Sequence, residues 1–98
     1  MKVINTSIPG VIKIQPKVHL DQRGYFFESF KTTDFLSHGL PTSFVQDNQA
    51  KSAKGVLRGL HYQLKYPQGK LVWVSKGKVL DVAVDIRQNS PTFGQYES

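Results

Sequence analysis

The sequence contains no cysteine. This absence excludes disulfide bonds and every metal site built on thiolate ligands. It also favours a cytoplasmic address, because disulfides are typical of secreted proteins. The three histidines, His19, His38 and His61, do not stand at a spacing that places two imidazoles on one metal ion. The sequence therefore predicts no metal site.

Long hydrophobic runs are also absent. No apolar stretch approaches the roughly 20 residues that a membrane-spanning helix needs. The apolar stretches within the first 16 residues are too short for the core of a signal peptide. We therefore expect no membrane partner.

Negative charge is scarce: 13 Lys and Arg stand against 7 Asp and Glu, a net charge of +6. Such a surface attracts polyanions, namely nucleic acid, anionic lipid or a phosphorylated small molecule. The cationic residues are scattered, so they do not form a basic tail, and a merely solvated basic surface stays an alternative. A length of 98 residues fits a single domain over residues 1–98.

Short runs of Val, Ile and aromatic residues alternate with turn residues, which predicts an all-β domain with at most one short helix. We expect strands at residues 11–15, 25–30, 43–48, 55–63, 70–76 and 79–86. The turn "DQRG" would close one hairpin, and Lys76-Gly77-Lys78 would close another. The helix is expected near 33–38, with Thr32 or Thr33 as its cap and Gly39 at its end.

The predicted strand 79–86 has two different faces, because side chains alternate along a strand. One face is apolar and is expected to be core: Leu80, Val82, Val84 and Ile86. The opposite face carries Asp81 and Asp85 beside small apolar residues. That face suits the lining of a polar pocket, and simple contact with solvent explains it equally well.

The stretch "VLRGLHYQ" holds two polar side chains in a strand-like run. If it pairs with "GKLVWV" as a hairpin, His61 and Lys70 come close across the ladder. Such a pair suits abstraction of a proton alpha to a carbonyl, with Lys70 stabilising the enolate oxygen. A structural core histidine beside a surface lysine is the alternative. Arg58 and His61 would lie on opposite faces of a regular strand, so a shared pocket requires a bulge or kink, which Gly59 permits.

Four motifs together resemble the dTDP-4-dehydrorhamnose 3,5-epimerase family: "DQRGYFFESF", "SFVQDNQAKSAKGVLRGLHYQ", "QGKLVWVSKGKVLDVAVDIR" and "SPTFGQY". The resemblance covers residues 3–96 and the N-terminal half of the family's usual chain. It implies a cupin-type antiparallel jelly roll, incomplete in this chain, and a homodimer. It also implies action on a dTDP-4-dehydro-6-deoxyhexose in dTDP-rhamnose biosynthesis, without metal or organic cofactor.

The resemblance assigns roles to individual residues. His61 resembles the base that removes the protons at C5 and C3, and Lys70 resembles the residue that stabilises the enolate at the C4 oxygen. The implied substrate-binding residues are Arg23, Glu28, Gln46, Asp47, Asn48 and Arg58. In the family "RGYFFE" binds across the dimer interface, so each site would use residues of both chains.

The chain differs from the family in length, because it is shorter than the family's usual chain. The general acid and the carboxylate that orients the base are expected beyond Ser98, and Tyr96 does not match the position of the acid. We therefore expect the N-terminal part of a longer domain, which by itself forms little product. The alternatives are a related dTDP-sugar epimerase or ketoisomerase, a non-catalytic sugar-nucleotide-binding module, and a nucleic-acid-binding β domain. Nucleic acid is not the expected partner, because the aromatic residues that would stack on bases belong to the epimerase motif.

Overall fold

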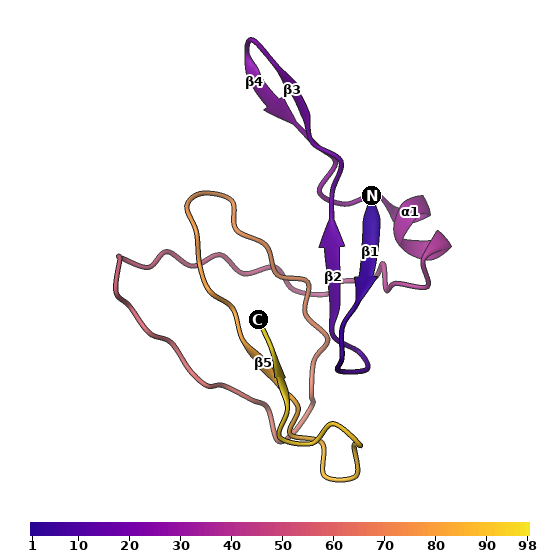
Figure 1. The fold of residues 1–98 in the computed structure, drawn as a ribbon, viewed down its shortest axis with the longest axis vertical. Helices are drawn as coiled ribbons and strands as arrows, with labels where there is room; N and C mark the ends of the chain where they lie inside the picture. The colour runs from indigo at the N-terminus through magenta and orange to yellow at the C-terminus, as the bar shows by residue number, and fades with distance from the viewer. The chain divides into compact units, whose positions relative to one another are not determined.

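The computed structural model describes all 98 residues. It divides into two compact units, which we call the hairpin unit, Met1–Phe44 with Leu80–Ser98, and the loop unit, Val45–Val79. The hairpin unit contains every regular element (Figure 1). These are β1 (Lys2–Asn5), β2 (Ile12–Gln15), β3 (His19–Asp21), β4 (Gly24–Phe26), α1 (Thr32–Ser37), β5 (Ala83–Val84) and β6 (Tyr96–Glu97). No helix is long and apolar enough to cross a bilayer.

Three antiparallel pairs make up the sheet structure: β1 with β2, β3 with β4, and β5 with β6. The β1–β2 register runs from Lys2 opposite Gln15 to Asn5 opposite Ile12. Strand β2 confirms the strand predicted at 11–15, and the β3–β4 pair confirms the hairpin around "DQRG". The predicted strand at 25–30 extends only to Phe26. Strand β1 was not predicted, because "KVIN" is too short to show an alternating pattern.

Helix α1 confirms the helix predicted near 33–38, but its predicted cap is wrong. The N-cap residue is Lys31, and no side chain caps the helix. The end is as predicted: Gly39 has φ +68 and donates its N–H to the Leu36 carbonyl at 3.0 Å, a conformation that glycine adopts without steric cost. Phe35 on this helix is only 2% exposed.

The buried apolar residues are Ile8, Phe35 and Leu40. Phe30 packs edge-on against Phe35, with ring centroids 4.6 Å apart. The apolar face predicted for residues 79–86 is not part of this core: Leu80 is 82% exposed, whereas Asp85 on the opposite face is 5% exposed. That core prediction is wrong in this structure, because only Ala83 and Val84 pair as a strand and Leu80 has no apolar layer to pack against.

Asp85 is buried because its carboxylate is satisfied by hydrogen bonds. It accepts bonds from the Arg87 backbone N–H at 3.0 Å and from Arg87 Nε and Nη2 at 2.9 Å each. The Ser90 and Thr92 hydroxyls donate to it at 2.5 and 2.6 Å. Arg87 Nη2 also donates to the Pro9 carbonyl at 2.9 Å. The cluster thus ties the turn after β5 to the β1–β2 connection, and Asp85 is a structural residue rather than a pocket lining.

The hydrogen bonds to Asp85 should make the stability of the folded chain fall in acid. The bonds from Arg87, Ser90 and Thr92 hold the pKa of Asp85 well below its usual range. A carboxyl with a lowered folded-state pKa adds stability above its unfolded pKa of about 3.9, and this stability is lost as the pH falls. We expect the unfolding midpoint in urea to fall between pH 5 and pH 2. Asp85→Asn should be less stable at pH 7 and should flatten this dependence.

Asp81→Asn is the matched control, because the Asp81 carboxylate is exposed and accepts no hydrogen bond. It should leave the acid dependence unchanged. An Asp85→Asn variant with the wild-type slope below pH 4 would contradict the role given to the cluster.

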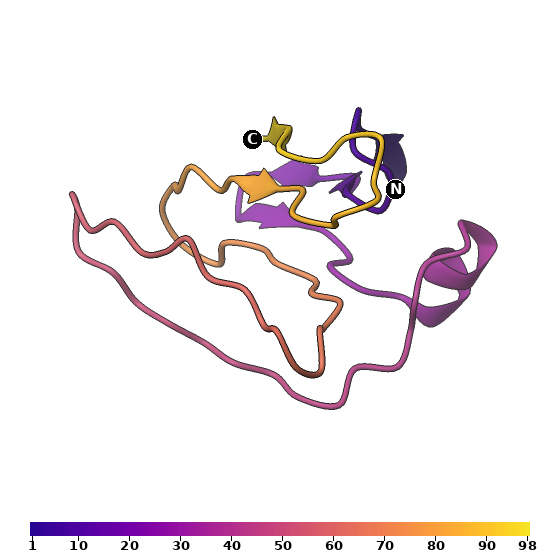
Figure 2. The same cartoon turned by 90° about the horizontal axis from the view of Figure 1, so that it is seen from below.

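The loop unit contains no helix or strand, and Figures 1 and 2 draw residues 45–79 as a continuous coil. The strands predicted at 43–48, 55–63 and 70–76 and the hairpin at Lys76-Gly77-Lys78 are therefore wrong in this structure. The physical reason is exposure. Leu57 is 91% exposed, and strands of this length need a third strand or a covering layer to be stable in water.

Candidate active site

Arg23 lies in the turn between β3 and β4 and is held by its own hairpin. Its backbone N–H donates to Asp21 Oδ1 at 2.8 Å, and its Nε and Nη2 donate to Asp21 Oδ2 at 3.2 and 2.6 Å. The side-chain bond to Arg23 is the main cause that lowers the pKa of Asp21. The Asp21 carboxylate orients the Arg23 guanidinium and partly neutralises its charge. The guanidinium remains exposed to solvent.

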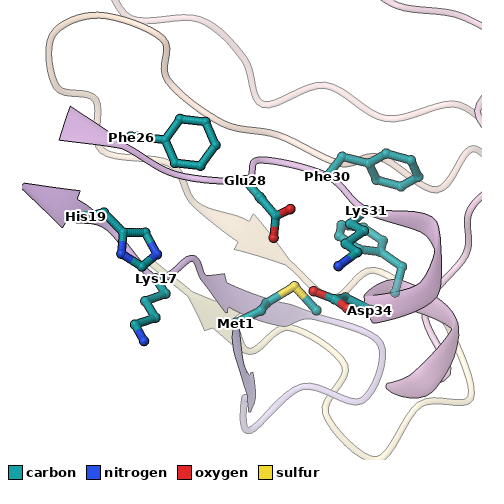
Figure 3. Close-up of a pocket in the computed structure, with 9 residues that line it drawn as sticks. Met1, Lys17, His19, Phe26, Glu28, Phe30, Lys31 and Asp34 are labelled. Atoms are coloured by element: carbon teal, nitrogen blue, oxygen red, sulfur yellow. The ribbon is translucent and has the colours of Figure 1, made fainter.

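Glu28 follows β4 and lines a cavity of about 200 Å³ within the hairpin unit (Figure 3). The other lining residues are Met1, Lys17, His19, Phe26, Phe30, Lys31, Asp34 and Phe35. In Figure 3 the Glu28 carboxylate points toward Met1 and Asp34. No ion pair or side-chain hydrogen bond engages Glu28. The cavity therefore combines three phenylalanine rings with side chains of both charges.

The segment "QDN" opens the loop unit. Gln46 Nε2 donates to Asn48 Oδ1 at 3.1 Å, so two of the three predicted binding residues contact each other. All three side chains, Gln46, Asp47 and Asn48, are exposed. They offer amide and carboxylate groups to a ligand from one short stretch of chain.

Arg58 is anchored by two neutral oxygens. Its Nε donates to the Ser52 hydroxyl at 2.9 Å, and its Nη2 donates to the Lys51 carbonyl at 3.2 Å. No carboxylate pairs with it. Arg58 therefore keeps its full positive charge available, unlike Arg23.

Gly59 interrupts the run that holds Arg58 and His61. Its φ of +105 lies in the region that residues with a side chain rarely adopt, and a Cβ built there would meet the His61 backbone nitrogen at 3.3 Å. The predicted kink is confirmed. The shared pocket of Arg58 and His61 stays a prediction.

His61 and Lys70 are both exposed, and neither side chain forms a hydrogen bond or an ion pair. No strand ladder joins residues 55–63 to 70–76, so the predicted hairpin between them is wrong in this structure, and the closeness of the two side chains stays a prediction. Their catalytic roles stay predictions. Groups of three or more His, Asp or Glu placed to hold a metal ion are not found.

Three features were missed from the sequence. The anchoring of Arg58 by Lys51 and Ser52 could have been found, because Lys54-Gly55 is a turn signal that folds residues 51–52 back toward residue 58. The buried cluster of Asp85 could have been suspected from "DIRQNSPT", where hydroxyls follow a carboxylate at turn spacing. The cavity beside Glu28 had no sequence signal, since its lining residues come from separate segments.

Comparison with known proteins decides the family. The family described as dTDP-4-dehydrorhamnose 3,5-epimerase matches residues 5–98. The chain belongs to this epimerase family. It is 58% identical over 98 residues to the dTDP-4-dehydrorhamnose 3,5-epimerase of Shigella flexneri, and 56% identical over 97 residues to that of Pseudomonas aeruginosa. Each alignment covers 98% of this chain and 54% of the relative.

A solved epimerase has the same fold. The crystal structure of dTDP-6-deoxy-D-glucose-3,5-epimerase from Legionella pneumophila, in complex with dTDP-4-keto-L-rhamnose, matches with a TM-score of 0.88 and 54% identity. The match covers 98% of this chain and 52% of that chain. The prediction of an all-β, cupin-type jelly roll that is incomplete in this chain, with one short helix, is confirmed.

The chain spans about half the length of these three epimerases. Single-domain organisation over residues 1–98 stays a prediction. The family assignment confirms the predicted resemblance and disfavours the nucleic-acid-binding alternative.

Proposed function

We propose that this chain provides the base and much of the substrate-binding half of a dTDP-4-dehydrorhamnose 3,5-epimerase. One observation carries the proposal: the epimerase family matches residues 5–98, a stretch that includes every residue given a role. The substrate is a dTDP-4-dehydro-6-deoxyhexose. A relative binds dTDP-4-keto-L-rhamnose in its crystal structure, which supports this substrate class.

The chemistry follows from the ketone at C4, which acidifies the C–H bonds at both C3 and C5. His61 takes the proton from each carbon in turn as general base, and the electron pair moves into the C4 carbonyl to form an enolate. Lys70 stabilises the negative oxygen of that enolate. Delivery of a proton to the opposite face of the carbon then inverts the centre. No residue of this chain is assigned as the acid that delivers it.

Two arginines serve the diphosphate in this proposal. Arg58 presents an uncompensated charge, and Arg23 presents a guanidinium held at the tip of a hairpin. Guanidinium groups form bidentate, charge-assisted bonds to phosphoryl oxygens. Glu28 and the segment "QDN" provide acceptors and donors for the nucleoside and the sugar. We further propose a cytoplasmic homodimer in which "RGYFFE" of each chain serves the other chain's site.

Binding of dTDP tests this half of the proposal. Arg23→Ala and Arg58→Ala should each weaken dTDP binding by roughly 10- to 100-fold, the range expected for a lost charge-assisted contact. The affinity should also fall with added salt, because exposed charges are screened. Isothermal titration of the 98-residue chain measures both effects.

Lys78→Ala is the control, because it removes one positive charge from a residue outside the proposed site. It should change dTDP affinity by less than about twofold. A single-stranded oligonucleotide that binds more tightly than dTDP would instead support the nucleic-acid alternative.

A non-catalytic binding module is the second candidate for the 98-residue chain by itself. The observation that favours it is the coverage of about half of each relative. Binding of dTDP without turnover would be its signature.

A further inference from the structure

Arg58 is held by a turn that lies directly before it in the chain. The Val56 N–H donates to the Ala53 carbonyl at 3.3 Å, and Gly55 has φ +86. A positive φ at the third position is the mark of a type II turn, which requires glycine there. This turn reverses the chain, so that the Ser52 hydroxyl and the Lys51 carbonyl reach the Arg58 guanidinium.

The two bonds use one particular edge of the guanidinium. Its five N–H groups lie in a plane: Nε–H and one Nη2–H share one edge, and Nη1 and Nη2 share the end. Ser52 and Lys51 accept from Nε and Nη2 respectively, so they occupy the first edge. At the end of the guanidinium, one N–H of Nη1 and one N–H of Nη2 point outward in parallel. This end remains available to a bidentate anion.

The chemical nature of the two acceptors matters as much as their position. A hydroxyl and a backbone carbonyl are neutral, so they orient the guanidinium without cancelling its charge. The contrast lies within the same chain, where Asp21 orients Arg23 through the same Nε and Nη2 atoms but compensates its charge. Of the two arginines, Arg58 is therefore the stronger attractor for a phosphoryl group.

We propose that Ser52 is a positioning residue: its hydroxyl, together with the Lys51 carbonyl, fixes the side edge of Arg58 so that the Nη1–Nη2 end meets the diphosphate of the substrate. This inference rests on the proposed function. Ser52 does not contact the substrate in this arrangement and acts only through Arg58. Without the Ser52 hydroxyl the guanidinium can rotate. Binding must then order the Arg58 side chain, at a cost in conformational entropy.

A double-mutant cycle on dTDP binding, measured by calorimetry on the 98-residue chain, tests this role. Ser52→Ala should weaken binding by roughly three- to tenfold, the scale of one hydrogen bond of ordinary strength, because Ser52 acts on the ligand only through Arg58. Ser52→Thr retains the hydroxyl and should restore most of the affinity. In an Arg58→Ala background, Ser52→Ala should cause no further loss, because the group it positions is gone.

Two further variants separate positioning from a general effect on folding. Ser75→Ala removes a hydroxyl elsewhere in the loop unit, where Ser75 forms no hydrogen bond, and it should bind dTDP as the wild type does. Arg58→Met keeps an unbranched stem without donors, and it should abolish the effect of Ser52→Ala in the same way as Arg58→Ala.

The outcomes are distinguishable. Equal losses from Ser52→Ala in the wild-type and Arg58→Ala backgrounds would overturn the positioning role, and so would full affinity of Ser52→Ala in a chain that requires Arg58. Failure of the wild-type chain to bind dTDP would overturn the proposed function of the binding half, and this inference with it.

Discussion

His61→Ala should abolish solvent deuterium exchange at both C5 and C3 of dTDP-4-dehydro-6-deoxyglucose. One base serves both centres in the proposed mechanism, so neither carbon can lose its proton without it. The variant is best made in a fusion that joins residues 1–98 to the remaining C-terminal part of the Pseudomonas aeruginosa epimerase, which is 56% identical over the shared half. Proton NMR in deuterated water follows each position separately.

His38→Ala is the matched control for this experiment. His38 is an exposed histidine at the end of α1, where its Nδ1 lies 2.8 Å from the Asp34 carbonyl oxygen. It should exchange at the rate of the parent fusion. Exchange that persists at one centre in the His61→Ala fusion would show that a second base exists, and the single-base mechanism would then be wrong.

Lys70→Ala has the second largest expected effect, a slowing of exchange at both centres by about a hundredfold or more. This is the scale on which single oxyanion-stabilising donors act. Both enolates carry their charge on the same C4 oxygen, so loss of the ammonium should slow the two steps together. The initial rates at C5 and C3, measured at saturating substrate, give the two factors.

Lys65→Ala controls for the loss of a positive charge in the loop unit. Its exchange rates at C5 and C3 should stay within about twofold of those of the parent fusion. A Lys70→Ala fusion with an unchanged turnover number and only a raised KM would contradict enolate stabilisation. It would place Lys70 among the substrate-binding residues instead.

The parts of the fold that local sequence determines could be predicted. The turn "DQRG" lies between β3 and β4, because Asp and Gly specify a tight reversal regardless of what packs nearby. The end of α1 at Gly39 and the kink at Gly59 follow from the same freedom of glycine. The N-cap of α1 was misassigned because two threonines beside its start offered a better capping residue than Lys31.

The strands of the loop unit could not be placed correctly from pattern alone. Val72 and Trp73 have the residue types of a buried strand, yet both are exposed. Hydrophobic pattern predicts a preference for burial, and it does not provide the layer that buries the residue. For the same reason the pattern placed Asp85 on an open face, whereas its five hydrogen bonds place it in a closed cluster.

The candidate site could likewise be predicted from the sequence only in part. Motif resemblance proposed site roles for residues that all lie within one family match: Arg23, Glu28, the "QDN" segment, Arg58, His61 and Lys70. It did not indicate that Asp21 bonds to Arg23 and Ser52 to Arg58, since a motif records residue types and not side-chain geometry.

The most direct test of the central claim is deuterium incorporation by the wild-type fusion and by the 98-residue chain, measured side by side by NMR with dTDP-4-dehydro-6-deoxyglucose. The fusion should incorporate deuterium at both C3 and C5 and form the doubly epimerised sugar. The 98-residue chain should bind dTDP but form little product. Absence of exchange in a fusion that binds dTDP, or robust epimerisation by the 98-residue chain alone, would show that this chain does not act as the base-providing half of the enzyme.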